Sequence, residues 1–143
     1  VALKEATAQF LQIIGDQKVD KIVGIESRGF VIGGILADRL NAGFVPVRKP
    51  KKLPAAVYKE SYTLEYGTDS IEMHIDAIQP GDHVILHDDL LATGGTAEAA
   101  IKLIEKAGGK IIGILFIIEL SFLHGRAKLG SYPVHALVEY DGE

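Results

Sequence analysis

The stretch HVILHDDLLATGGTAEAA, residues 83–100, decides the fold that the sequence predicts. It begins with a nearly continuous apolar run over residues 83–87, which is typical of a parallel strand that helices cover on both faces. Two adjacent acids, Asp88 and Asp89, end this run. In an open α/β sheet, ligands bind outside the carboxyl ends of the strands. The stretch therefore predicts a strand, a ligand-binding turn and a helix, in that order.

The turn has the sequence ATGGT and is typical of a phosphate site. Its glycines allow backbone N–H groups to turn toward an anion, and the helix that we expect from about Thr96 adds the positive end of its dipole. Carboxylates beside a phosphate would repel it unless they accept hydrogen bonds from sugar hydroxyls or hold a bridging metal. We therefore expect a sugar-phosphate site, with an ordinary capped helix after two solvated acids as the alternative. The candidate phosphate-binding residues are Ala92, Thr93, Gly94, Gly95 and Thr96.

Composition limits the class of protein. A chain of 143 residues fits one domain, and 48% hydrophobic and 24% charged residues are typical of a globular protein with no membrane-spanning run. The sequence has no cysteine, which excludes disulfides and thiolate metal sites and is compatible with a reducing compartment. Its net charge of −4 disfavours a nucleic-acid or anionic-membrane partner. We expect a cytoplasmic single-domain protein over residues 1–143, in which an anionic ligand meets a local basic patch.

Two upstream segments supply positive charge. A short strand at 21–25 ends in the loop Glu26-Ser27-Arg28-Gly29, where a forked guanidinium and the amides of a helix start favour a second anion site. The segment 48–54 holds four cations among seven residues, with two prolines that keep it extended. Surface charge on a tight turn and on a solvated face is the alternative interpretation of the two segments. Together with the ATGGT turn, they predict a cavity for a polyanion.

The remaining segments complete an α/β pattern. Helical spacing predicts helices over 3–14, from the loop after residue 29 to about residue 41, and over 96–107. Short β-rich runs predict strands at 44–47, 110–118 and 134–138, and alternation within 55–75 predicts a hairpin. The expected fold class is α/β, an open, mainly parallel twisted sheet flanked by helices, with a protruding hairpin loop. We interpret His87 as a hydrogen-bonded core residue rather than a catalytic one.

The segment DDLLATGGT resembles the signature of the type I phosphoribosyltransferases, in the form seen in members that act on adenine. The resemblance continues through SYTLEYG at 61–67 and through the pattern ELxxLxGRxKL at 119–129, which includes Glu119, Gly125 and Arg126. It implies the type I phosphoribosyltransferase fold with a flexible hairpin loop. It also implies that the N-terminal hood, a small segment whose backbone helps such enzymes to read the base, is absent or reduced here.

The resemblance implies a role for each candidate residue around the sugar and the base. Asp88 and Asp89 would orient the ribose hydroxyls as catalytic residues. Glu65, a third catalytic candidate, would close over the sugar phosphate together with Tyr66 and assist at the base. Leu120 would touch the flat face of the base.

The resemblance also assigns the pyrophosphate end and its partners. The pyrophosphate-binding residues would be Ser27, Arg28, Gly29, Arg48, Lys49 and Lys52. In some members the basic segment reaches the neighbouring subunit, which implies a homodimer. Mg²⁺ is the implied cofactor, bridging pyrophosphate and ribose oxygens near the acid pair with no direct protein ligand expected.

The implied activity is transfer of the 5-phosphoribosyl group from phosphoribosyl pyrophosphate to adenine, which gives AMP and pyrophosphate in purine salvage. Two alternatives remain open. One is a phosphoribosyltransferase for another purine. The other is a truncated or non-catalytic module that binds phosphoribosyl pyrophosphate without turnover.

Overall fold

The computed structural model describes residues 2–64 and 67–142. Glu65 and Tyr66, two of the predicted site residues, lie outside the described residues. The elements are α1 (Ala2–Ile14), β1 (Lys21–Ile25), α2 (Gly29–Leu40), β2 (Gly43–Val47), β3 (Val57–Leu64), β4 (Gly67–His74), β5 (His83–Leu91), α3 (Gly95–Lys106), β6 (Lys110–Leu120), the short 3₁₀ helices η1 (Ser121–Leu123) and η2 (Gly125–Lys128), and β7 (Val134–Tyr140).

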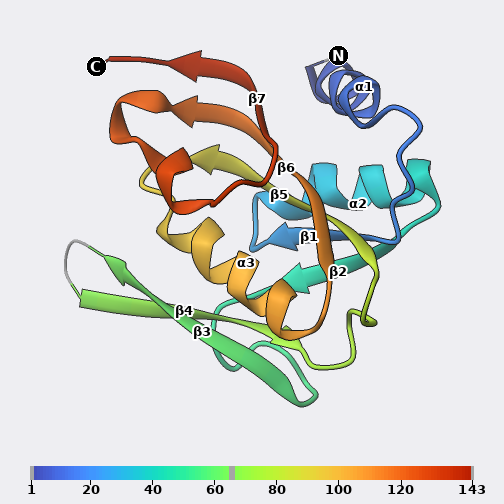
Figure 1. Ribbon diagram of the computed structural model, residues 1–143, viewed down its shortest axis with the longest axis vertical. Coiled ribbons are helices and arrows are strands. Elements are labelled where there is room, and N and C mark those ends of the chain that lie inside the picture. The colour runs from blue at the N-terminus through green and yellow to red at the C-terminus, as the bar shows by residue number, and fades with distance from the viewer. Residues whose placement is uncertain (1, 65–66, 143) are drawn as a thin grey trace.

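A five-stranded sheet in the order β2-β1-β5-β6-β7 forms the centre of the molecule, and all of its neighbouring strands are parallel (Figure 1). This confirms the predicted fold class. One boundary differs from the prediction, because β5 continues past its expected end at residue 87 and includes the acid pair. The cause is β6, which runs on to Leu120 and pairs its Phe116 with Asp88 and its Glu119 with Leu91.

Both faces of the sheet are buried because alternate residues of each strand point to opposite sides. Ile22 and Ile85 belong to a cluster formed with α1 and α2 on one face. Val23 and Leu86 belong to a cluster on the other face, which α3 and the β3–β4 hairpin cover. Figure 1 shows α3 lying between the sheet and the hairpin. None of the helices in the described part of the chain is long and apolar enough to cross a membrane.

The strand order places a topological switch point between β1 and β5. From β1 the chain crosses to β2 on one side, and after the hairpin it returns to β5 on the other side of β1. The connections that leave β1 and β5 at their carboxyl ends therefore diverge and open a crevice, which is where ligands bind in sheets of this kind.

The predicted hairpin is present as β3 and β4, a separate antiparallel pair. Tyr58 and Tyr62 of β3 pack against the core cluster that contains α3. Near the main sheet, Arg48 just after β2 forms an antiparallel bridge with Glu72 of β4. The hairpin is thus held beside the carboxyl ends of the strands.

Candidate functional site

A cavity of about 440 Å³ opens at the switch point, between the ends of β1 and β5, the start of α3 and the inner side of the hairpin. It brings together six of the residues that the sequence predicted: Ser27, Arg28, Lys49, Asp88, Asp89 and Thr96. These residues come from segments far apart in the chain. The common cavity supports the prediction that the acid pair and the strand-end loop serve one ligand.

A second hollow of about 220 Å³ lies over the glycine turn and shares Asp88, Asp89 and Thr96 with the first. All five predicted residues of the turn line it. Gly94 has a φ of +90°, a conformation that glycine adopts without the steric cost of a Cβ atom. The turn leads directly into α3, so the first backbone N–H groups of that helix and the positive end of its dipole face this hollow.

The two acids differ in their surroundings. Burial raises the pKa of Asp88 well above its ordinary value, so this side chain keeps a proton at higher pH than an exposed aspartate does. Its Oδ1 accepts the backbone N–H of Asp89 at 2.8 Å. Asp89 lies toward the cation, with its Oδ2 3.5 Å from Nη1 of Arg28. One acid can therefore donate a hydrogen bond while the other accepts.

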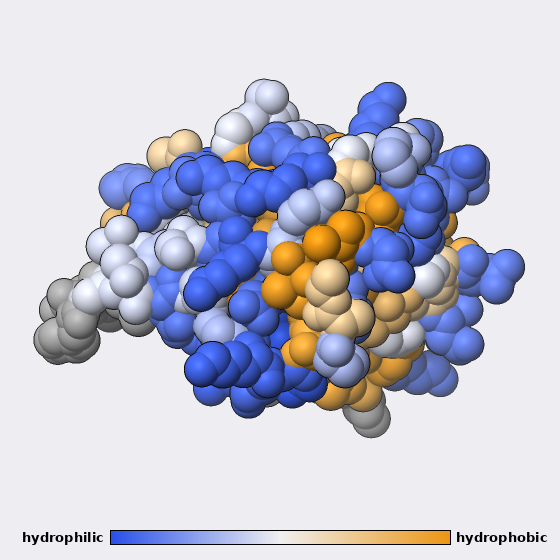
Figure 2. Space-filling view, turned by 90° about the horizontal axis from the view of Figure 1, so that it is seen from below, coloured by the Kyte–Doolittle hydropathy of each residue, from blue (hydrophilic) through white to orange (hydrophobic). Residues whose placement is uncertain are grey.

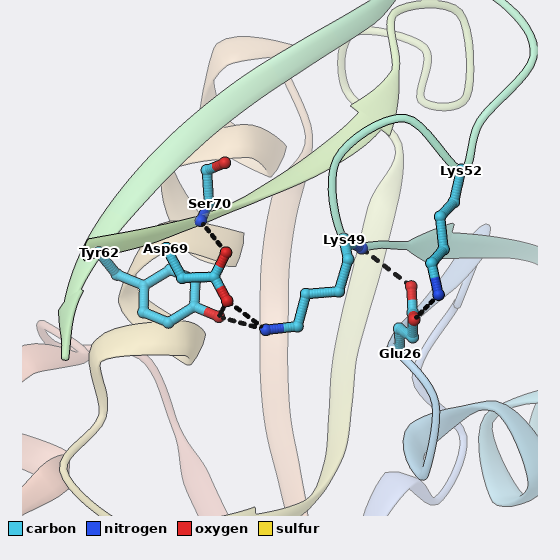
Figure 3. Close-up of polar contacts among 6 residues, drawn as sticks. All are labelled: Glu26, Lys49, Lys52, Tyr62, Asp69 and Ser70. Carbon is cyan, nitrogen blue, oxygen red and sulfur yellow. Dashed lines mark hydrogen bonds and ion pairs between the residues drawn. The ribbon is translucent and has the colours of Figure 1, made fainter. Parts of the chain in front are cut away.

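Lys49 links the basic segment to the hairpin (Figure 3). Its Nζ lies 2.5 Å from Oδ2 of Asp69 on β4 and donates to Oη of Tyr62 on β3 at 3.1 Å. The hydrogen bonds to Asp69 and Tyr62 raise the pKa of Lys49, and the hydrogen bond from Lys49 holds the pKa of Asp69 below its ordinary value. Lys49 and Tyr62 line the cavity.

Glu26, at the end of β1, binds the other part of the basic segment. Its carboxylate accepts the backbone N–H of Lys49 at 2.9 Å, Nε of Arg48 at 3.2 Å and Nζ of Lys52 at 3.1 Å. Burial alone would raise the pKa of Glu26, but these donors outweigh burial and hold it below its ordinary value. Figure 3 shows that Lys49 has an acidic partner at each end: its backbone amide donates to Glu26, and its ammonium group donates to Asp69.

Among the predicted site residues that the structure describes, four line neither cavity: Gly29, Arg48, Lys52 and Leu120. Gly29 lies where a Cβ atom would be 2.9 Å from the carbonyl oxygen of His87, so it allows a close backbone approach. Arg48 and Lys52 are turned to Glu26, and Leu120 ends β6. Their binding roles stay predictions.

Three polar residues at or beside the cavity had no role predicted from the sequence. Glu26 directly precedes the predicted loop, so its position at a strand end could have identified it. Tyr62 lies within the quoted segment SYTLEYG, where only Glu65 and Tyr66 were assigned roles. Asp69 carries no signal of its own, because its importance depends on how the hairpin lies against Lys49.

His87 has the contacts of a core residue, as predicted. It is 0% exposed, its Nδ1 bonds the carbonyl oxygen of Leu115 at 3.0 Å, and its ring meets Phe10 edge to face. Burial lowers its pKa to about 4, so the ring is neutral at physiological pH.

The acid pair fits a magnesium ion that takes most of its ligands from elsewhere. Among residues 2–64 and 67–142, no group of three or more His, Asp or Glu side chains could hold a metal by itself. Mg²⁺ keeps several waters and binds through one or two carboxylates plus phosphate oxygens of a substrate. Asp88 and Asp89 lie side by side on the cavity wall, where an ion of this kind would meet them.

Residues 2–129 match the family described as phosphoribosyl transferase domain. The adenine phosphoribosyltransferase of Flavobacterium johnsoniae is 56% identical over 139 residues, which are 97% of this chain and 82% of that protein. The crystal structure of adenine phosphoribosyltransferase from Rhodothermus marinus has a TM-score of 0.93 at 57% identity, covering 96% of this chain and 79% of that one. The enzyme from Saccharomyces cerevisiae, crystallised with an imino-altritol bisphosphate and adenine, has a TM-score of 0.87 at 46% identity, covering 94% and 77%.

Proposed function

Because the chain belongs to the phosphoribosyl transferase domain family, we infer that it transfers the 5-phosphoribosyl group from phosphoribosyl pyrophosphate to adenine, giving AMP and pyrophosphate. The observation that carries this proposal is that the acid pair lines both the hollow over the glycine turn and the cavity with Arg28 and Lys49. If the 5′-phosphate of the sugar lies in the turn, the ribose hydroxyls can contact the acid pair. The pyrophosphate group can then contact Arg28 and Lys49.

In the proposed mechanism, backbone N–H groups of the turn and of the first residues of α3 bind the 5′-phosphate. Asp89 accepts hydrogen bonds from the ribose hydroxyls, and Asp88, in its protonated form, can also donate one. The bond between C1′ and the pyrophosphate oxygen breaks with its electron pair going to that oxygen. N9 of adenine forms the new bond to C1′, and its proton passes to the departing pyrophosphate.

Charge near the reacting carbon is where the protein contributes most. The sugar becomes cation-like while pyrophosphate departs, so a fixed carboxylate at Asp89 stabilises the sugar. Arg28 and Lys49 balance the negative charge that develops on the leaving group. Glu65, Tyr66 and Leu120 keep their predicted roles at the sugar phosphate and the base.

Mg²⁺ is the proposed cofactor, and the cysteine-free composition fits a cytoplasmic enzyme of purine salvage. When bound, the ion would neutralise pyrophosphate charge and orient ribose oxygens. Asp88 and Asp89 would lie near it and hold it through water. Removal of Mg²⁺ with a chelator is expected to abolish transfer and to leave the fold intact.

We also propose a homodimer in which the basic segment serves the partner's site. Arg48 and Lys52 line neither cavity of their own chain, although the resemblance gives both a pyrophosphate contact. Both side chains are held by Glu26, which lines the larger cavity, and this position suits residues that act across a subunit boundary.

The test offers the protein radiolabelled adenine, phosphoribosyl pyrophosphate and Mg²⁺ and measures labelled AMP. Guanine, hypoxanthine and xanthine in parallel reactions identify the preferred base. The matched control is Asp88→Asn with Asp89→Asn, which should lose transfer and retain the wild-type circular dichroism spectrum. Transfer to another base, or phosphoribosyl pyrophosphate binding without product, would contradict the proposal.

A further inference from the structure

The pattern at 119–129 contains an ion pair that the proposed mechanism does not use. Glu119, near the end of β6, has a side chain only 4% exposed. Arg126 in η2 grips its carboxylate with Nε at 2.9 Å from both oxygens and with Nη2 at 2.8 Å from Oε1. Nη1 of Arg126 also donates to the carbonyl oxygen of Val134 at 3.0 Å. Arg126 is therefore fixed in plane and direction by the end of β6 and the start of β7.

The residue before this arginine lies directly against the phosphate turn. A Cβ atom on Gly125 would be 2.5 Å from the carbonyl oxygen of Ala92, and one on Gly94 would be 2.6 Å from the carbonyl oxygen of Gly125. Backbone thus meets backbone, with no side chain between the two segments. Leu91 fills the space beside the two segments, and its Cδ1 would be 2.9 Å from a Cβ atom on Gly125. A small shift of Gly125 must move the turn, because no flexible side chain can absorb it.

We propose that Glu119 and Arg126 are positioning residues for the 5′-phosphate, because together they hold Gly125 as a brace behind the turn 92–96. The proposal rests on the proposed function, since it takes the ligand of the turn to be a sugar phosphate. Neither Glu119 nor Arg126 lines either of the two cavities of the site, so the pair acts on the ligand only through the backbone of the turn. Binding groups misplaced by about 1 Å lose much of their effect.

The test uses Arg126→Lys, which keeps the charge but loses the fork. Isothermal titration of the purified protein measures the affinity for AMP, ribose 5-phosphate and inorganic pyrophosphate. We expect AMP and ribose 5-phosphate to bind on the order of tenfold more weakly, because both place a phosphate in the turn. Pyrophosphate, which meets Arg28 and Lys49 at the other end of the cavity, should bind as in wild type. Arg39→Lys, on the exposed last turn of α2, is the matched control and should change none of the three affinities.

Hydrogen exchange at the amides of residues 92–96 gives a readout that needs no ligand. Arg126→Lys should speed exchange there and leave the amides of residues 26–29 unchanged. If Arg126→Lys does not fold, the pair Glu119→Gln with Arg126→Met removes both charges at once and leaves no buried carboxylate without a partner. The same selective changes are expected from it.

Three results would overturn the proposed role of Glu119 and Arg126. The affinities for AMP and ribose 5-phosphate could stay unchanged while only the melting temperature falls, or all three ligands could bind equally more weakly. The third is unchanged amide hydrogen exchange at residues 92–96. Failure of the wild-type protein to bind any of the three ligands would overturn the proposed function instead. In that case the exchange data would still decide whether Arg126 orders the turn.

Discussion

At the scale of single residues, Asp88 combines a proposed catalytic role with an environment that disfavours its charged form. Burial raises its pKa above the ordinary value of 3.8. The folded state therefore loses no stability through Asp88 below that pH, and it loses stability as pH rises, because Asp88 ionises more readily in the unfolded chain. Asp88→Asn replaces the ionisable carboxyl by a neutral amide and keeps an oxygen for the N–H of Asp89. We therefore expect the variant to lose transfer and to unfold at a higher temperature than wild type. Near neutral pH the gain in unfolding free energy should be on the order of 1 kcal/mol or more.

The sign of the pH dependence makes this prediction specific. The advantage of Asp88→Asn, measured by thermal unfolding, should be larger at about pH 8 than at about pH 5, because only wild type has to ionise the buried acid. Asp76→Asn changes an exposed acid of the same type and should give no such gain. An advantage that grew on acidification would refute the interpretation of Asp88.

At the scale of elements, the β3–β4 hairpin is joined to the strand-end segment through Lys49 and Asp69. Both side chains are partly exposed, so Asp69→Asn should cost less than about 1 kcal/mol of global stability. The local effect should be larger, because the ion pair is the hairpin's charged contact with Lys49. We expect faster amide exchange over 57–64 and 67–74, with α3 and β5 unchanged. Asp76→Asn, just beyond β4, is the control, and equal exchange in both variants would rule out the linking role of Asp69.

Elements with a strong local pattern could be predicted from the sequence. The apolar run before Asp88 and the glycines after it gave the βα unit, and period-two alternation gave the hairpin. The end of β5 was misplaced, because the length of β6 decides how far the acids are paired. The Lys49–Asp69 pair and the cis peptide bond between Glu26 and Ser27 were not predicted, since both lack a local sequence signal.

At the scale of the whole molecule, the proposed dimer predicts complementation between two inactive variants. Arg48→Ala keeps its own acids, while Asp89→Asn keeps the basic segment that the partner's site needs. Mixed subunits then form heterodimers with one intact site, so a statistical mixture should regain about a quarter of wild-type activity. The measurement is AMP formation after joint refolding of equal amounts. A mixture of Asp88→Asn and Asp89→Asn serves as the control, because both lesions then lie in the acid pair and no intact site can form.

The pairing of every cation predicted for the pyrophosphate end has a consequence for how a polyanion arrives. Arg28 is beside Asp89, Lys49 beside Asp69, and Arg48 and Lys52 share Glu26. The positive and negative charges at the entrance therefore nearly cancel at long range. Electrostatic attraction of a diffusing polyanion is weak, and the association rate should depend little on ionic strength. Recognition then occurs at short range, where phosphate oxygens of the ligand replace the protein's carboxylates as partners of these cations.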